Sequence, residues 1–112
     1  FYKSDSGNIP VLDFLSYLPN KHKNKALFVI DLLSEYGYLL KEPYTKHLSG
    51  TKLKELRIQS SPNIYRIFYF FYSNRKFILL HAFTKKTQSL PKEEINIAIK
   101  RMKDYTRRSN NE

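Results

Sequence analysis

Four cationic side chains stand where they could bind a phosphodiester. Arg57 ends one segment of strand-like alternation, Arg66 lies within the next, and Lys85 and Lys86 follow the third. Because neighbouring strands lie only about 4.8 Å apart, such side chains can converge on one site. Guanidinium and ammonium groups there can stabilise the charge that develops on a phosphate in a transition state. The pattern predicts Arg57, Arg66, Lys85 and Lys86 as catalytic residues, with Lys54 as a further candidate.

Arg66 lies in residues 64–72, the most apolar stretch of the chain. A guanidinium in a core carries a large free-energy cost unless it is paired or reaches an open surface. One interpretation is therefore an ion pair with Glu55 on the neighbouring strand. The other is an arginine that faces a phosphate. The two are compatible if Glu55 orients Arg57 or Arg66 and leaves one edge of the guanidinium group free.

Cleavage of RNA is one reaction that such a site could support without a metal. The ribose 2′-hydroxyl is an internal nucleophile, which the protein must align and deprotonate while it stabilises the phosphate and protonates the leaving 5′-oxygen. Candidate contacts to the RNA are Lys46, Lys52, His47, Tyr65 and His81. His47 and His81 are also candidate acids or bases, although half-buried packing is the favoured interpretation of His81.

Composition limits the classes of protein that remain. Lysine and arginine number 20 against 10 aspartate and glutamate, so the net charge is 20 − 10 = +10, which favours an anionic partner such as a nucleic acid. The chain has no cysteine, which excludes disulfides and thiolate catalysis and is consistent with a reducing cytoplasm. No apolar run approaches the roughly 20 residues of a membrane span. No His, Asp and Glu cluster has the spacing of metal ligands, so we predict no metal and no cofactor.

The elements that must position these residues predict one α+β domain over residues 1–112. We expect a strand at 1–3, helices from Pro10 and over 21–39, a loop over 41–50, strands at 52–58, 64–72 and 77–83, and a helix from Pro91. The resulting order, β-α-α-β-β-β-α, predicts a mostly antiparallel sheet with helices packed on one side. Alternation in the last strand places Phe77, Leu79, His81 and Phe83 on one face. Gly37 is expected to end the second helix, and residues 109–112 to form a disordered tail.

The chain resembles the HigB branch of the RelE-like toxins over essentially its whole length. The matching residues are Leu53-Lys54-Glu55-Leu56-Arg57, Tyr65-Arg66-Ile67-Phe68-Tyr69 and His81-Ala82-Phe83-Thr84-Lys85-Lys86, with Lys46-His47-Leu48 before them and Pro91, Glu94, Ala98, Arg101 and Asp104-Tyr105 after them. The resemblance implies the toxin of a type II toxin–antitoxin pair, a small α+β domain that cleaves mRNA without a metal, commonly on the ribosome.

The resemblance also implies partners and site residues. The expected partner is a HigA-like helix-turn-helix antitoxin, which forms a hetero-oligomer with the toxin in the cytoplasm, without a membrane. The implied site residues are Arg57, Arg66 and Lys85 or Lys86, together with Lys54. Two alternatives stay open on the residues alone: a non-catalytic RNA-binding module, and a basic module that binds only its acidic protein partner.

Overall fold

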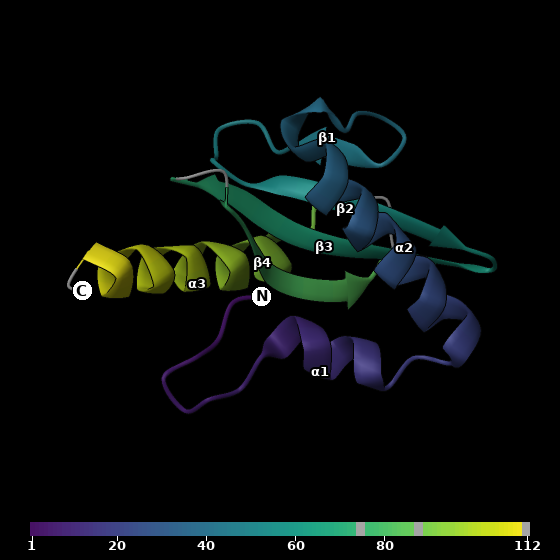
Figure 1. Cartoon of the computed structure of the whole chain (residues 1–112), viewed down its shortest axis with the longest axis horizontal. Helices are drawn as coiled ribbons and strands as arrows, with labels where there is room; N and C mark the ends of the chain where they lie inside the picture. The colour runs from purple at the N-terminus through teal and green to yellow at the C-terminus, as the bar shows by residue number, and fades with distance from the viewer. Residues whose placement is uncertain (74–75, 87–88, 111–112) are drawn as a thin grey trace.

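The computed structural model of the chain describes residues 1–73, 76–86 and 89–110. The helices are α1 (Pro10–Ser16), α2 (Asn20–Tyr36), the 3₁₀ helix η1 (Gly37–Leu39) and α3 (Lys92–Asn110). The strands are β1 (Thr45–His47), β2 (Lys54–Ser60), β3 (Asn63–Tyr72) and β4 (Lys76–Thr84). They form an antiparallel sheet in the order β1-β2-β3-β4 (Figure 1), which confirms the α+β class.

The order of the elements is α-α-β-β-β-β-α, so the predicted order is wrong at its beginning. Residues 1–3 do not form a strand, although the backbone N–H of Tyr2 donates to the Leu79 carbonyl at 2.9 Å. The fourth strand is β1, inside the segment whose Pro43 and Gly50 predict a loop. A strand of three residues is too short for alternation to reveal it. Its position is fixed by tertiary contacts, such as the hydrogen bond from the buried Thr45 hydroxyl to the Leu40 carbonyl at 2.9 Å.

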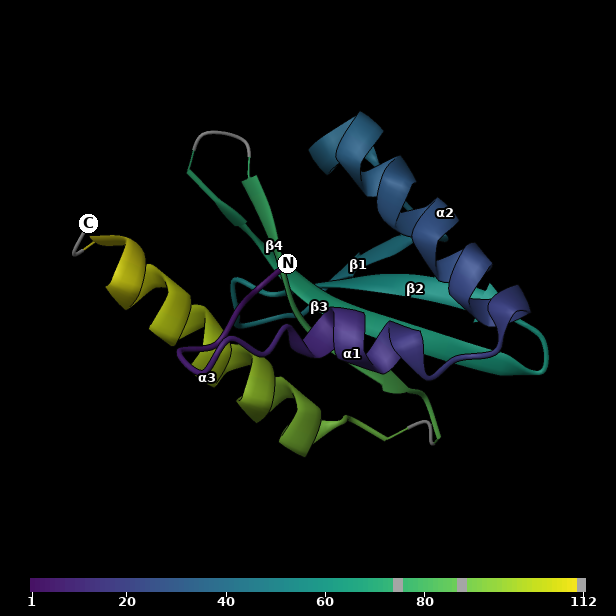
Figure 2. The ribbon, with the colours of Figure 1, turned by 60° about the horizontal axis from the view of Figure 1, so that its bottom comes forward.

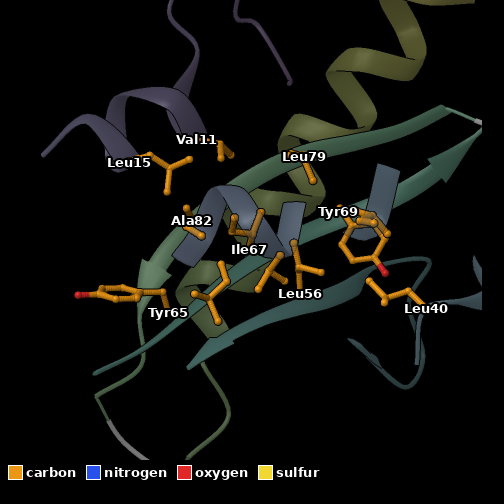
Figure 3. Packing of buried hydrophobic residues seen from close by; sticks show 13 residues of the cluster. Val11, Leu15, Leu40, Leu56, Tyr65, Ile67, Tyr69, Leu79 and Ala82 are labelled. Atoms are coloured by element: carbon orange, nitrogen blue, oxygen red, sulfur yellow. The ribbon is translucent and has the colours of Figure 1, made fainter. Parts of the chain in front are cut away.

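Helices pack against both faces of the sheet, rather than against one face as predicted. α1 and α2 cover the face shown in Figure 3, where the buried residues include Val11, Leu15, Ala26, Val29, Leu33, Leu56, Ile67 and Tyr69. α3 covers the other face, where the buried residues include Leu53, Phe68, Phe70, Leu80 and Ala98. The reason lies in β3, which is apolar on both faces and therefore needs cover on both.

A bulge in β4 changes the face to which its side chains point. Phe68 pairs with His81, but the next residue, Tyr69, pairs with Leu79, so Leu80 is an additional residue. Phe77 and Leu79 consequently pack on the side of α1 and α2, whereas Phe83 packs on the side of α3. The predicted common face for Phe77, Leu79, His81 and Phe83 is therefore wrong, because strict alternation assumes uninterrupted pairing. The bulge directs His81 toward α3.

The ends of the helices follow simple rules. Gly37 ends α2 as predicted, with a positive φ of 59°. α3 follows Pro91 and continues through Asn110, so Ser109 and Asn110 are helical rather than part of the predicted tail, and residues 111–112 lie outside the described residues. Among the described helices, none combines the length and the apolar character that crossing a membrane requires.

The N-terminal segment lies alongside α3 (Figure 2). The hydroxyl of Tyr2 donates to a carboxylate oxygen of Asp104 at 2.7 Å, and the guanidinium of Arg108 donates to the Lys3 carbonyl at 2.5 Å. Asp104 also pairs with Arg108 at 2.8 Å. These contacts join the first residues of the chain to the C-terminal half of α3.

Candidate functional site

The face of the sheet that α3 partly covers carries two rows of side chains that cross the strands. Lys46, Glu55, Phe68 and His81 form one row through successive pairing. Arg57, Arg66 and Phe83 form the next row. Because directly paired residues of antiparallel strands point to the same face, Arg57 and Arg66 are neighbours there, with Glu55 beside them. The predicted convergence from separate strands is present for these two arginines.

Glu55 is shared by both arginines. One of its oxygens lies 3.3 Å from Nη1 of Arg66, and the other lies 3.6 Å from Nε of Arg57. The Glu55 side chain is 3% exposed, the Arg66 side chain is 14% exposed and the Arg57 side chain is 37% exposed. The interpretation of Arg66 as the partner of Glu55 is therefore confirmed. Nε of Arg66 is buried without a hydrogen-bond partner among the described residues, which is uncommon in folded proteins.

Arg66 also lines an open hollow of about 530 Å³ at the β4 edge of the sheet. The charged residues that line it are Arg66, Lys85, Lys86, Lys92, Glu93 and Glu94. Phe83 supplies an apolar wall. The volume falls within the roughly 300–1,000 Å³ of pockets that hold small ligands. Four cations against two carboxylates favour an anion in this hollow, and the four cations are the groups that can bind its oxygens.

Two predicted catalytic residues lie apart from this hollow. Arg57 lines a second hollow of about 220 Å³, together with Lys25, Tyr44 and Gln59, and is linked to Arg66 through Glu55. Lys54 pairs with Tyr69 of β3, whose ring belongs to the core under α1 and α2, so it lies on the opposite face of the sheet. The structure therefore brings together Arg66, Lys85 and Lys86, but not Lys54.

The predicted RNA contacts are dispersed. Tyr65 is 3% exposed, packs edge-on against Phe14 and receives a hydrogen bond from Asn63 at 2.9 Å, so its ring is not available for stacking on a base. Its neighbour on the same face, Tyr69, is also buried, which raises the pKa of Tyr69 to about 12 and removes it as an acid near neutral pH. Both tyrosines are core residues.

The cationic candidates near β1 lie at different places. Lys46 is exposed on the face that carries Glu55. His47 is exposed, and its Nε2 donates to the Thr51 carbonyl at 2.9 Å. Lys52 lines a separate groove with Phe70 and the C-terminal half of α3. Lys46 and Lys52 therefore both lie on the α3 side of the sheet, as Arg57 and Arg66 do, but neither lines the hollow that Arg66 lines.

His81 forms a chain of hydrogen bonds with two residues of α3. Nη1 of Arg101 donates to the Leu80 carbonyl at 2.9 Å and lies 3.1 Å from Nδ1 of His81. Nε2 of His81 lies 2.7 Å from Oε1 of Glu94. Burial and the nearby Arg101 lower the pKa of His81, although Glu94 acts in the opposite direction. These contacts fit a neutral ring in which Nδ1 accepts from Arg101 and the Nε2 proton is donated to Glu94.

Sequence reasoning missed the roles of Glu94 and Arg101 in this chain of contacts. Their spacing of seven residues places them on one face of a helix, which is a signal that they could act together. The sequence does not show that His81 is their partner on the sheet, because the bulge at Leu80 decides that His81 points toward α3. Among the described residues, no three His, Asp or Glu side chains are grouped to hold a metal ion.

The chain matches a known protein family over most of its length. The family described as "Phage derived protein Gp49-like (DUF891)" matches residues 13–103, which is most of the chain. The matched range contains β2, β3 and β4 and the first half of α3, and therefore all the charged residues of the hollow. No curated protein matches the chain.

Proposed function

The chain belongs to the Gp49-like family, which is part of the RelE/HigB-like toxin group, and from this premise we propose that it is the toxin of a type II toxin–antitoxin pair of the HigB branch. Its proposed activity is metal-independent cleavage of mRNA, on the ribosome, in the cytoplasm. Its proposed partner is a HigA-like helix-turn-helix antitoxin. The observation that supports cleavage best is the meeting of Arg66, Lys85 and Lys86 at one open hollow.

The proposed reaction is attack of the ribose 2′-oxygen on the adjacent phosphorus. A bond forms between these atoms, the bond from phosphorus to the 5′-oxygen breaks, and the products carry a 2′,3′-cyclic phosphate and a 5′-hydroxyl. Arg66, Lys85 and Lys86 stabilise the phosphoryl oxygens as their negative charge increases. A lysine ammonium can also protonate the 5′-oxygen that leaves. Glu55 holds Arg66 through Nη1, which fixes the guanidinium before RNA binds.

A non-catalytic RNA-binding module, or a module that binds only the antitoxin, is the second candidate. The observation that favours it is the internal pairing of Arg66, whose side chain is 14% exposed. Such a module would bind RNA with an affinity that falls steeply with salt, because phosphate contacts release counterions. It would give no cut products. The presence or absence of products in the same RNA therefore separates the two candidates.

The test compares Arg66→Ala with the wild-type protein on labelled mRNA, with and without ribosomes, followed by primer extension. We expect Arg66→Ala to lose at least about 100-fold in cleavage rate, as enzymes do when one transition-state donor is removed. Arg107→Ala is the matched control, because Arg107 is 66% exposed and pairs with Asp104 on α3. Wild-type cleavage by a folded Arg66→Ala protein would remove the hollow as the catalytic site.

A further inference from the structure

We infer that Glu94 is the general base that deprotonates the 2′-hydroxyl, and that His81 and Arg101 position its carboxylate. The inference rests on the proposed RNA cleavage. It assigns a catalytic function to Glu94, and it makes His81 and Arg101 positioning residues that do not touch the RNA.

The first observation is the place of Glu94. It lies in the first turn of α3 and lines the same hollow as Arg66, Lys85 and Lys86. Its side chain is 33% exposed, so a ligand in the hollow can reach it. A phosphate held by the cations brings the 2′-hydroxyl of its own ribose into the hollow, because the two groups belong to adjacent carbons of one sugar. A proton acceptor is therefore present where the reaction needs one.

The second observation is that a chain of hydrogen bonds holds the carboxylate of Glu94 in place. The Leu80 carbonyl holds Arg101, Arg101 donates to Nδ1 of His81, and Nε2 of His81 donates to Oε1 of Glu94 at 2.7 Å. The ring of His81 also stacks on Phe83, with centroids 5.7 Å apart and an interplanar angle of 19°. This arrangement fixes the tautomer of His81 and leaves Oε2 of Glu94 without a hydrogen bond from any described residue. Oε2 is the atom that can accept the proton.

The other groups at the site fit this task less well. Glu55 is 2% exposed and shared by two arginines, so RNA does not reach it. Both ring nitrogens of His81 are occupied by Glu94 and Arg101. A lysine ammonium group is a proton donor, so the lysines in the hollow suit the protonation of the leaving group better. Glu93 also lines the hollow, but no hydrogen bond or ion pair with a described residue orients its carboxylate.

The proton balance of the step is simple. Oε2 of Glu94 takes the 2′-hydroxyl proton as the bond from the 2′-oxygen to phosphorus forms. The electron pair of the breaking bond stays on the 5′-oxygen, which receives a proton from the ammonium group of Lys85 or Lys86. Glu94 then returns its proton to solvent, and the lysine regains one.

The test is Glu94→Gln, with Glu93→Gln as a control that removes a neighbouring charge from the same hollow. Glutamine keeps the oxygen that accepts from His81, but it does not accept the 2′-hydroxyl proton. We expect single-turnover cleavage to slow at least about 100-fold in Glu94→Gln and to change by a much smaller factor, less than about tenfold, in Glu93→Gln. The affinity of Glu94→Gln for an RNA oligonucleotide with a 2′-deoxy sugar at the scissile position should not be lower than that of the wild-type protein, because the carboxylate that the substitution removes is repelled by phosphate.

Two further measurements separate a base from a structural residue. The cleavage rate of the wild-type protein should rise with pH along one limb of its pH profile, and this limb should be absent in Glu94→Gln. Glu94→Asp keeps a carboxylate and should retain that limb at a reduced rate. His81→Gln should lower the rate less than Glu94→Gln does, and the double variant should be no slower than Glu94→Gln alone.

Each outcome decides between defined alternatives. Cleavage at the wild-type rate by Glu94→Gln would overturn the inference and make the contact between His81 and Glu94 purely structural. An equal loss in Glu93→Gln would also overturn it, since the effect would then be one of charge in the hollow. Failure of the wild-type protein to cut RNA, with or without ribosomes, would refute the proposed function and this inference with it. That failure appears in the wild type itself, so it is distinguishable from failure of the base assignment.

Discussion

Replacing Glu55 by glutamine should destabilise the protein by about 3 kcal/mol, because Arg66 would be left charged and largely buried. The Glu55 side chain is 3% exposed and the Arg66 side chain is 14% exposed, so both partners have lost most of their water. Removal of one partner of such a pair typically costs about 3–5 kcal/mol. We take the lower end because glutamine preserves the volume and still offers a carbonyl oxygen. The partner Arg57 adds little, since pairs at a 37% exposed side chain contribute about 0–1 kcal/mol.

The assay is urea denaturation followed by circular dichroism, which gives the free energy of unfolding of each variant. The decisive comparison is between Glu55→Gln and the double variant Glu55→Gln/Arg66→Gln. Replacement of both members of a buried pair by neutral groups is often close to neutral. The double variant should therefore be more stable than Glu55→Gln alone, although it carries one more substitution.

The control is Glu42→Gln, which changes an exposed glutamate in the loop before β1 and should alter the free energy of unfolding by less than about 0.5 kcal/mol. Two results would contradict the reasoning. One is a loss of less than about 1 kcal/mol in Glu55→Gln, which is the range of exposed pairs. The other is a double variant that is less stable than either single variant, since Arg66 would then not depend on Glu55 for compensation.

Two further predictions concern stability. Burial and Arg101 depress the folded-state pKa of His81 below its ordinary value of 6.5. The stability from neutral His81 is therefore complete above about pH 6.5 and is lost as the pH falls toward the folded-state pKa, because the unfolded chain binds the proton more readily. Midpoints of thermal unfolding between pH 7.5 and 5 should fall less in His81→Gln than in the wild type, and parallel curves would exclude His81 as the cause. Gly37→Ala should lower the free energy of unfolding, measured in urea, by about 1–2 kcal/mol, because a φ of 59° disfavours a side chain and the new Cβ would lie 3.4 Å from the ring of Phe77. An unchanged free energy of unfolding would mean that the backbone relaxes there without cost.

The strands that carry the arginines were predictable because burial enforces their pattern. β2 alternates between a core residue such as Leu56 and the site residues Glu55 and Arg57, and β3 is apolar on both faces. Their predicted limits lie within two residues of the observed ones. The pairing of Arg66 with Glu55 follows from the same physics, since an unpaired charge in such a strand carries a large cost.

The bulge could not be predicted, and its consequences extend to the site. Ile78, Leu79 and Leu80 are three consecutive apolar residues, so alternation does not show which of them is additional. The sequence therefore leaves the direction of His81 undetermined. That direction decides whether His81 joins the core under α1 and α2 or meets Glu94 and Arg101 of α3. A change of strand pairing by one residue thus decides whether His81 is a packed core residue or orients the carboxylate of Glu94.

Two glutamates in different surroundings serve different purposes in the proposed mechanism. Glu55 is sealed between two arginines, so it can hold Arg66 but cannot exchange a proton with RNA. Glu94 is 33% exposed beside the same cations and is held by a neutral histidine, so its second oxygen stays available. The cations account for binding and for stabilisation of the phosphoryl oxygens, and Glu94 adds an acceptor for the 2′-hydroxyl proton. Glu55→Gln should therefore lower the free energy of unfolding, while Glu94→Gln should lower the rate of cleavage in a protein that stays folded. If both variants changed stability alone, the hollow would be an RNA-binding surface. The proposed cleavage of RNA would then have to take place elsewhere in this chain.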